Sequence, residues 1–332
     1  MNKRSILITG GAGYIGSHVA LHLAERAERV IILDNISRGF RQAARNLMLI
    51  EGDVANRSLV SSVLKSFDID TIMHFAAFTI VPESVREPLK YYDNNTCGTR
   101  SLIESAVECD VRHFVFSSTA AVYGVPQDGI ASEDSALAPI NPYGASKLMS
   151  EWILRDTAAA SNLRYVALRY FNVAGSDVQG RIGQATPNAT LLVKVACEVA
   201  VGKRPFLSIF GTDYPTPDGT GVRDYVHVED LASAHLAALD YLRANGASAI
   251  FNAGYGHGYS VREVIESVER VSGKRLEVRE QPRRAGDPPQ LIARTERIRK
   301  TLAWEPRLDD LDRIVATALA WERKLIENPW GR

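Results

Sequence analysis

Tyr143 and Lys147 stand four residues apart in the segment NPYGASK. On a helix this spacing places both side chains on one face, and Pro142 favours helix initiation directly before them. A phenol with a pKa of about 10 is a poor base at neutral pH, but a nearby ammonium favours the phenolate. We interpret Tyr143 as an acid/base for a hydroxyl proton, with a solvated Lys147 on a surface helix as the alternative.

A hydroxyl-rich segment offers a partner for this chemistry. Ser117, Ser118 and Thr119 lie at the end of an apolar run. In open α/β sheets, ligands bind at the carboxyl ends of the strands. A hydroxyl there is expected to hydrogen-bond the reacting oxygen.

Three glycines, Gly10, Gly13 and Gly16, follow the first apolar run and open a helical pattern in TGGAGYIGSH. This order lets the backbone and the helix N-terminus bind a pyrophosphate. About 20 residues on, Asp34 ends the run VIILD, where a carboxylate binds an adenosine ribose and repels a 2′-phosphate. The pattern predicts NAD, whose positive nicotinamide would further favour the Tyr143 phenolate. The alternative is a tight turn with Asp34 as a loop cap.

Further cofactor contacts are expected near this loop and at the ends of other strands. Asp53 and Val54 follow a short strand and would offer a carboxylate and an amide to the adenine edge. For each alone, turn chemistry or core packing is the alternative. The expected additional set is Tyr14, Ile15, Asn35, Asp53, Val54, Phe75, Ala76, Ala77, Asn94, Ser117 and Tyr170.

Apolar runs rich in β-branched residues recur between helical patterns. They cover residues 5–9, 29–33, 71–75, 113–117 and 165–170, with a shorter run at 47–50. Strands that alternate with helices predict an α/β fold with a doubly wound parallel Rossmann sheet.

After about Gly175 the composition of the chain changes, and the connections become rich in Gly, Pro, Asn and Asp. We expect residues 1–175 to form the NAD-binding domain and residues 176–332 mainly a smaller α/β substrate domain. A helical pattern at 229–242 and a strand at 249–252 resemble a return to the first sheet, so the boundary is expected to be discontinuous.

Composition excludes several partners. The 332 residues carry 39 basic and 39 acidic side chains, so no overall attraction to nucleic acid or a membrane is expected. The N-terminal apolar stretch is too short for a signal peptide or a membrane span, which favours a cytoplasmic protein. Cys97, Cys109 and Cys197 lack metal-ligand spacing and are interpreted as reduced thiols or small buried residues, so no metal is expected.

Five motifs occur in order: GGAGYIG, SSTAAVYG, YGASK, RYFN and GTGVRDYVHV. With them the chain resembles the extended short-chain dehydrogenase/reductases, and specifically the UDP-glucose 4-epimerase family, from about Ser5 to Glu305. The glycine loop and the YxxxK pair are shared across the superfamily. The RYFN strand and DYPTPDGTGVRDYVHV are much more specific to the epimerases.

The resemblance implies roles for the matching positions. Tyr143 would be the acid/base, Lys147 would bind the nicotinamide ribose, and Thr119 would supply the catalytic hydroxyl. Around the UDP-sugar it implies Thr119, Tyr143, Asn172, Asn188, Phe210, Arg223, Tyr225, Arg284, Asp287 and Leu291, with Phe210 and Tyr225 beside the uracil. Guanidinium groups suit a diphosphate, although a surface salt bridge is the usual role of an arginine.

The implied reaction interconverts UDP-glucose and UDP-galactose through transient oxidation at C4 by tightly bound NAD. Dehydratases of the superfamily need an acid after the strand-end Thr, where this chain has Ala120 and Ala121, so elimination is disfavoured. The alternatives are a UDP-xylose/UDP-arabinose epimerase, a dehydratase, a dehydrogenase that releases NADH, and a non-enzymatic NAD-sensing scaffold.

Two departures from the family pattern bear on ligands. Thr79 replaces a lysine that elsewhere helps to bind NAD, and Leu291 replaces a gatekeeping tyrosine, which predicts room for UDP-N-acetylhexosamines. His227 is interpreted as structural. The resemblance also suggests a homodimer through helices at 89–107 and 143–154, with intramolecular core as the competing interpretation.

Overall fold

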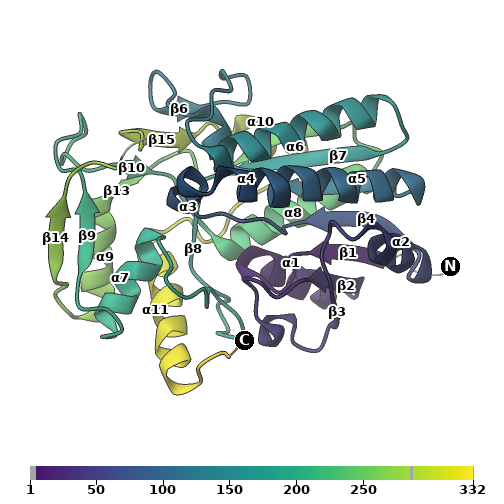
Figure 1. Cartoon of the computed structure of the whole chain (residues 1–332). Helices are drawn as coiled ribbons and strands as arrows, with labels where there is room; N and C mark the ends of the chain where they lie inside the picture. The colour runs from purple at the N-terminus through teal and green to yellow at the C-terminus, as the bar shows by residue number, and fades with distance from the viewer. Residues whose placement is uncertain (1–4, 285–286, 332) are drawn as a thin grey trace.

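A seven-stranded parallel sheet forms the centre of the molecule in the computed structural model, which describes residues 5–284 and 287–331 (Figure 1). Its strand order is β12-β7-β5-β4-β1-β2-β3, and all neighbouring strands are parallel. The strands are β1 (Ser5–Thr9), β2 (Arg29–Asp34), β3 (Met48–Glu51), β4 (Ile69–His74), β5 (His113–Ser117), β7 (Arg164–Tyr170) and β12 (Ala249–Ala253). The predicted doubly wound sheet is confirmed, and its order reverses between β1 and β4, where such folds bind ligands.

Helices cover both faces of this sheet because successive strand residues point to opposite sides. Ile6 and Ile8 pack in one apolar cluster with Val19 of α1, whereas Leu7 packs in the other with Leu102 of α5. The first layer contains α1 (Tyr14–Glu25) and α8 (Val228–Arg243), and the second contains α2 (Arg57–Ser66), α5 (Gly98–Glu108) and α6 (Pro142–Ala159). The helix and strand expected to return to the sheet are α8 and β12, which pairs with β7.

The other sheets and helices form a second region beside the ends of the central strands (Figure 1). A four-stranded sheet has the order β13 (Tyr259–Ser260), β10 (Val222–Arg223), β15 (Gln290–Ala293) and β6 (Ile130–Ala131). Two parallel pairs join β8 (Asn172–Ala174) to β11 (Tyr225–His227) and β9 (Leu207–Phe210) to β14 (Val278–Gln281). The helices are α7 (Leu192–Ala200), α9 (Val261–Ser272), α10 (Glu296–Leu302) and α11 (Leu311–Glu327).

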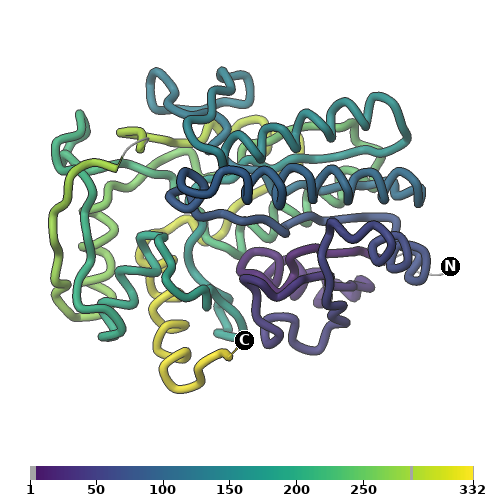
Figure 2. The backbone as a smooth tube through the Cα atoms, viewed as in Figure 1, coloured from purple at the N-terminus to yellow at the C-terminus, as the bar shows by residue number. Residues whose placement is uncertain are grey.

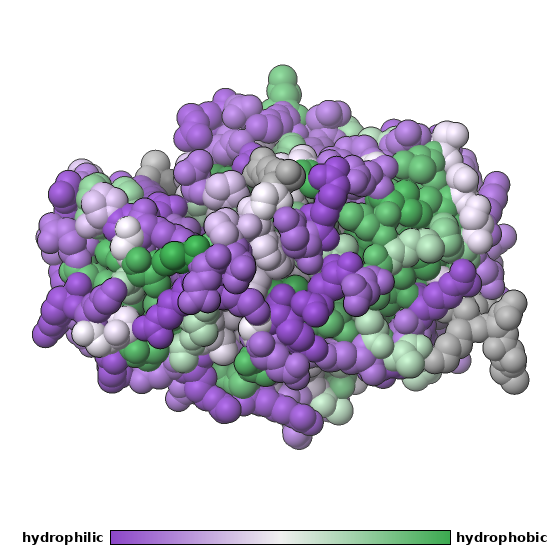
Figure 3. Space-filling model, turned by 90° about the horizontal axis from the view of Figure 1, so that it is seen from below, coloured by the Kyte–Doolittle hydropathy of each residue, from purple (hydrophilic) through white to green (hydrophobic). Residues whose placement is uncertain are grey.

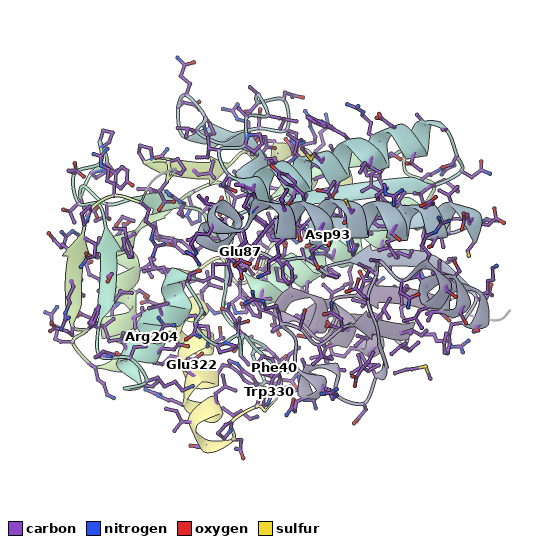
Figure 4. All side chains as sticks on the ribbon, in the orientation of Figure 1. Phe40, Glu87, Asp93, Arg204, Glu322 and Trp330 are labelled. Carbon is purple, nitrogen blue, oxygen red and sulfur yellow. The ribbon has the colours of Figure 1, made fainter. Side chains whose placement is uncertain are left out.

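The C-terminal segment after α11 returns to the N-terminal half, as the yellow end of the tube in Figure 2 shows. Trp330 packs against Phe40, with ring centroids 5.9 Å apart, and against Trp321 at 5.0 Å (Figure 4). Phe40 directly precedes the short 3₁₀ turn η1 (Arg41–Ala44). The end of the described chain thereby packs against the segment that follows β2.

The predicted helix at 89–107 is interrupted. Its residues form α4 (Pro88–Tyr91), a π-helical turn η2 (Tyr92–Cys97) and α5, and α3 (Val81–Arg86) precedes them. A π-helical turn widens the backbone spiral and often occurs at functional sites. Here it carries Asn94 and Asn95, which enter the site described below.

The surface has a mixed character, with hydrophilic residues spread over the face seen in Figure 3 and apolar surface concentrated on its right side. Over the described residues, no helix combines the length and apolarity needed to cross a bilayer. All three cysteines are free thiols; Cys197 is buried and Cys97 is exposed. The same described ranges contain no cluster of metal-binding side chains.

Candidate active site

A pocket with an empty volume of about 530 Å³ lies at the ends of β1, β2, β3 and β4. It is lined by Gly10, Gly13, Leu33, Asp34, Asn35, Ser37, Arg38, Gly39, Gly52, Asp53, Val54, Phe75, Ala76, Ala77, Phe78 and Asn94. Most of the predicted cofactor residues are therefore brought together. Six lining residues were not predicted, although each lies within four residues of a predicted one: Leu33, Ser37, Arg38, Gly39, Gly52 and Phe78.

The glycine loop leaves no room for side chains. Gly10 has φ +72°, and a Cβ there would lie 2.5 Å from the backbone N of Ala76. A Cβ on Gly16 would lie 2.4 Å from the carbonyl oxygen of Gly10. Tyr14, Ile15 and Gly16 form the first turn of α1, whose free amides face this region. A backbone-lined cradle at a helix N-terminus fits a pyrophosphate.

Asp34 both caps a loop and lines the pocket. Its carboxylate accepts hydrogen bonds from the backbone N–H groups of Ala12 and Ile36, each at 2.9 Å, and it also lines the pocket. Burial raises the pKa of Asp34, and the two amides oppose this. The neighbouring Asn35 donates to Asp53 at 2.8 Å, which connects the ends of β2 and β3.

Tyr143 lies in the first turn of α6, where the sequence predicted it. The side chain of Asn141 caps this helix by accepting from the N–H of Gly144 at 2.9 Å. Tyr143 is 7% exposed. Burial raises the pKa of the Tyr143 phenol, whereas the nearby Thr119 side chain lowers it.

Lys147 is buried, so the alternative of a solvated surface lysine is wrong. Its Nζ donates to the carbonyl oxygen of Ser117 at 2.9 Å and lies 4.8 Å from the Phe116 ring centroid. Burial lowers the pKa of Lys147 to about 7, and the Glu151 carboxylate opposes this shift. The predicted lowering of the Tyr143 pKa by Lys147 does not arise from the chain alone, because the ammonium is directed to Ser117.

Ser117 and Tyr170 join this group at the ends of β5 and β7. Their hydroxyl oxygens are 2.8 Å apart, and burial raises the pKa of the Tyr170 phenol. The ring of Tyr91 stands edge-on to Tyr143 at 6.5 Å and packs against Phe78 at 5.8 Å. These aromatic contacts connect the Tyr143 group to the glycine-lined pocket.

A buried ion pair below the Tyr143 group was not anticipated. Glu151 and Arg169 are each 2% exposed, and Nη2 of Arg169 lies 2.6 Å from Glu151. Glu151 also accepts from the Ser118 hydroxyl at 2.5 Å. The available signals were a glutamate one turn after Lys147 and an arginine inside the apolar strand RYVALRY.

The predicted UDP-sugar residues form a second group. Arg223 Nη2 lies 3.2 Å from Asp287, and the Arg284 guanidinium lies 3.7 Å from the Phe210 ring centroid. Leu291 is the register partner of Arg223 in the β10–β15 pair and is 9% exposed. It belongs to the apolar cluster that also contains Ala120 and Phe171. Leu291, which was predicted to affect substrate specificity, therefore packs close to the segment that follows Thr119.

Other predicted residues have different surroundings. The backbone N–H of Asn172 donates to Asp224 at 2.9 Å, and Asn188 is exposed with φ +54°. Tyr225 is 3% exposed within the apolar core, which leaves Phe210 as the more accessible ring for a base. His227 caps α8 and bonds Thr317 at 3.0 Å, in agreement with a structural role.

The chain matches known proteins along nearly its whole length. Residues 6–254 match the model of the NAD dependent epimerase/dehydratase family. The UDP-glucose 4-epimerase of Azospirillum brasilense is 53% identical over 321 residues, covering 96% of this chain and 92% of that protein.

Two solved structures have the same fold. The Brucella ovis UDP-glucose 4-epimerase in complex with NAD has a TM-score of 0.93 and 41% identity, covering 96% and 98% of the two chains. The Campylobacter jejuni UDP-Glc/GlcNAc 4-epimerase has a TM-score of 0.85 and 49% identity, covering 97% and 99%. The chain belongs to the NAD dependent epimerase/dehydratase family, among its UDP-glucose 4-epimerases.

Proposed function

We propose that this chain interconverts UDP-glucose and UDP-galactose by transient oxidation at C4 of the sugar, with NAD retained between turnovers. The observation that carries the proposal is the burial of Tyr143 and Lys147, one turn apart on α6, with Thr119 acting on the Tyr143 phenol. Family membership supports the same reaction, and the close fit of the backbone around Gly10 supports the cofactor.

NAD would be bound along the strand ends, mainly by residues 1–175 with the returning α8 and β12. The cradle of Gly10 and Gly13 and the first turn of α1 suit the pyrophosphate, and Asp34 suits the adenosine ribose. NAD bound there would supply reversible acceptance of the hydride from C4. Lys147 would position the nicotinamide ribose with its ammonium, beside the Ser117 carbonyl that now accepts its hydrogen bond.

Tyr143 takes the proton from the sugar O4 as the C4–H bond breaks, and Thr119 hydrogen-bonds the same oxygen. The Thr119 side chain already acts on the Tyr143 phenol, so O4 can approach both hydroxyls together. Burial of Tyr143 and Lys147 excludes water from the oxidised carbon. The 4-keto sugar turns about its diphosphate link, and Tyr143 then returns the proton to O4.

The UDP-sugar would be bound mainly by residues 176–332. Arg223 and Arg284 suit the diphosphate oxygens, because guanidinium groups bind them through two parallel hydrogen bonds. Phe210 would stack on the uracil, with Asn172, Asn188 and Asp287 as further contacts. Arg223 bonds Asp287 in the chain described here, so substrate binding would exchange a carboxylate partner for a phosphate.

Ala120 and Ala121 follow Thr119 in the 3₁₀ turn η3 (Ala120–Tyr123), where methyl groups offer no proton to a neighbouring carbon. This favours epimerisation over dehydration. Leu291 is shorter than tyrosine and packs near this turn, which favours additional turnover of UDP-N-acetylglucosamine. The similarity to a UDP-Glc/GlcNAc 4-epimerase supports this second substrate.

We further propose a homodimer that pairs the outer faces of the helical segments 89–107 and 143–154, together with α3. Leu89, Val85 and Trp152 are 79%, 61% and 45% exposed, whereas Leu102 and Leu148 on the inner faces are buried. The helices therefore have an apolar inner face and an apolar outer face. Light scattering of the purified protein should give twice the mass of the 36.5 kDa chain.

The main test uses purified protein with no added redox cofactor. We expect UDP-glucose and UDP-galactose to interconvert, and NAD to appear when the protein is denatured. Tyr143→Phe should lower kcat by about 10²- to 10⁴-fold, the usual contribution of a general acid/base, while NAD stays bound. Stoichiometric release of NADH would instead indicate a dehydrogenase, and full activity of Tyr143→Phe would contradict the assigned chemistry.

A further inference from the structure

Two walls of the cofactor pocket meet at Arg38 and Phe78, which follow β2 and β4 respectively and both line the pocket. The Arg38 guanidinium lies 5.5 Å from the Phe78 ring centroid. Its Nη2 donates to both oxygens of Glu83, at 2.8 and 3.0 Å. The cation therefore lies over a ring that lines the same pocket, and the Glu83 carboxylate binds the same cation.

Glu83 is anchored from its own side by two more donors. Lys90 Nζ lies 2.8 Å from one oxygen and 5.3 Å from the Phe78 ring centroid, and the Tyr91 hydroxyl donates to the other oxygen at 2.9 Å. Burial raises the pKa of Glu83, but hydrogen bonds from Lys90 and Tyr91 and the charge of Arg38 lower it overall. The carboxylate is therefore charged at neutral pH.

The backbone behind the ring is fixed by the π-helical turn. Asn95 accepts from the N–H of Phe78 at 2.8 Å and donates to its carbonyl at 3.0 Å. Glu87 and Asp93, labelled in Figure 4, mark this segment near the centre of the molecule. Glu83 is 12% exposed and Arg38 is 39% exposed, so the Glu83 side is the fixed part and Arg38 is the part that can move away.

We infer that the Arg38–Glu83 ion pair, seated on Phe78, is a clasp that retains NAD in the pocket. The inference rests on the proposed NAD-dependent function and concerns how long the cofactor stays. Residues on both sides of Arg38, Ser37 and Gly39, also line the pocket, so opening the pair frees that wall. Thr79 is exposed next to Phe78, at the position where the family pattern has a lysine, and the clasp provides two cations, Arg38 and Lys90, beside the Phe78 ring.

The clasp differs from direct binding of NAD by Arg38. In a clasp, both partners are needed, and loss of either one opens the same contact. If Arg38 instead bound a phosphate of NAD, removing the Glu83 charge would free the guanidinium and slow NAD release. The two arrangements therefore predict opposite effects of Glu83→Gln, which keeps the size of the side chain and an acceptor for Tyr91.

The experiment measures release of NAD from the holoenzyme into an excess of a dehydrogenase that traps free NAD. Arg38→Ala and Glu83→Gln should each accelerate release by about 5- to 30-fold, from one exposed ion pair and one cation–π contact. The double variant should release NAD within about 2-fold of the faster single variant, because both changes break one contact. Arg57→Ala is the matched control, since Arg57 is 43% exposed and pairs with Glu104 and Glu108 away from the pocket.

Unchanged release in both single variants, faster release in Arg38→Ala alone, or additive effects in the double variant would overturn the clasp. Arg38→Lys provides a second variant that keeps the charge but loses the fork, and it should release NAD at an intermediate rate. Circular dichroism checks that each variant is folded. A wild-type protein without bound NAD would contradict the proposed function, whereas NAD-loaded protein with unaltered release rates contradicts only the clasp.

Discussion

Replacing Arg169 by methionine should strongly destabilise the protein, because it removes the partner of a buried carboxylate. Arg169 donates to Glu151 through Nε at 3.0 Å and Nη2 at 2.6 Å, and to the Tyr123 hydroxyl through Nη1 at 3.0 Å. Both members of the ion pair are 2% exposed, so water cannot replace the lost guanidinium. Among the residues that the structure describes, only the Ser118 hydroxyl would remain as a side-chain hydrogen-bond donor to Glu151.

The expected loss is about 3–5 kcal/mol, the usual cost of leaving one buried charge unpaired. With an unfolding entropy of about 2.1 cal/mol/K per residue, a chain of 332 residues would lose about 4–7 °C in Tm. The double variant Arg169→Met/Glu151→Leu should recover most of this loss, because no buried charge remains. Its activity should stay low, since Ser118 loses its partner next to Thr119.

Differential scanning calorimetry measures Tm for the wild type, for Arg169→Met, for Glu151→Leu and for the double variant. Arg155→Met is the control on α6, the helix that carries Glu151, because Arg155 is 63% exposed and its pair with Asp156 should contribute less than about 1 kcal/mol. The reasoning is refuted if Arg169→Met changes Tm no more than Arg155→Met does. A double variant that loses the sum of both single losses would refute it as well.

Three further variants test the site. Burial lowers the pKa of Lys147 to about 7 from 10.5. Above pH 7 the unfolded chain therefore binds more protons than the folded chain, and the free energy of unfolding rises with pH. Lys147→Met should flatten this rise in denaturant titrations between about pH 7 and 9. Leu291→Tyr should lower turnover of UDP-N-acetylglucosamine relative to UDP-glucose, and an unchanged ratio would contradict the packing argument. Gly10→Ala should lose bound NAD, since its Cβ would meet the Ala76 backbone at 2.5 Å; an unaltered NAD content after gel filtration would show that the cradle tolerates a side chain.

Local patterns made the sheet and the glycine cradle predictable. The apolar runs identify strands that the structure places within about two residues of the expected bounds, because strand periodicity and the glycine turn depend on neighbouring residues. The four-residue spacing of Tyr143 and Lys147 likewise determined that they share a helix face. Motifs spread over nearly the whole chain also identified the family from the sequence.

Only the tertiary structure decided which distant groups meet. Arg38 and Glu83 are 45 residues apart, and the Glu151–Arg169 pair joins a helix to a strand. Periodicity states which face of an element is buried, but a charged residue on that face has many conceivable partners until the elements pack. For the same reason the sequence alone left Lys147 free to be a solvated lysine, whereas packing between Phe116 and the Ser117 carbonyl made it a buried one.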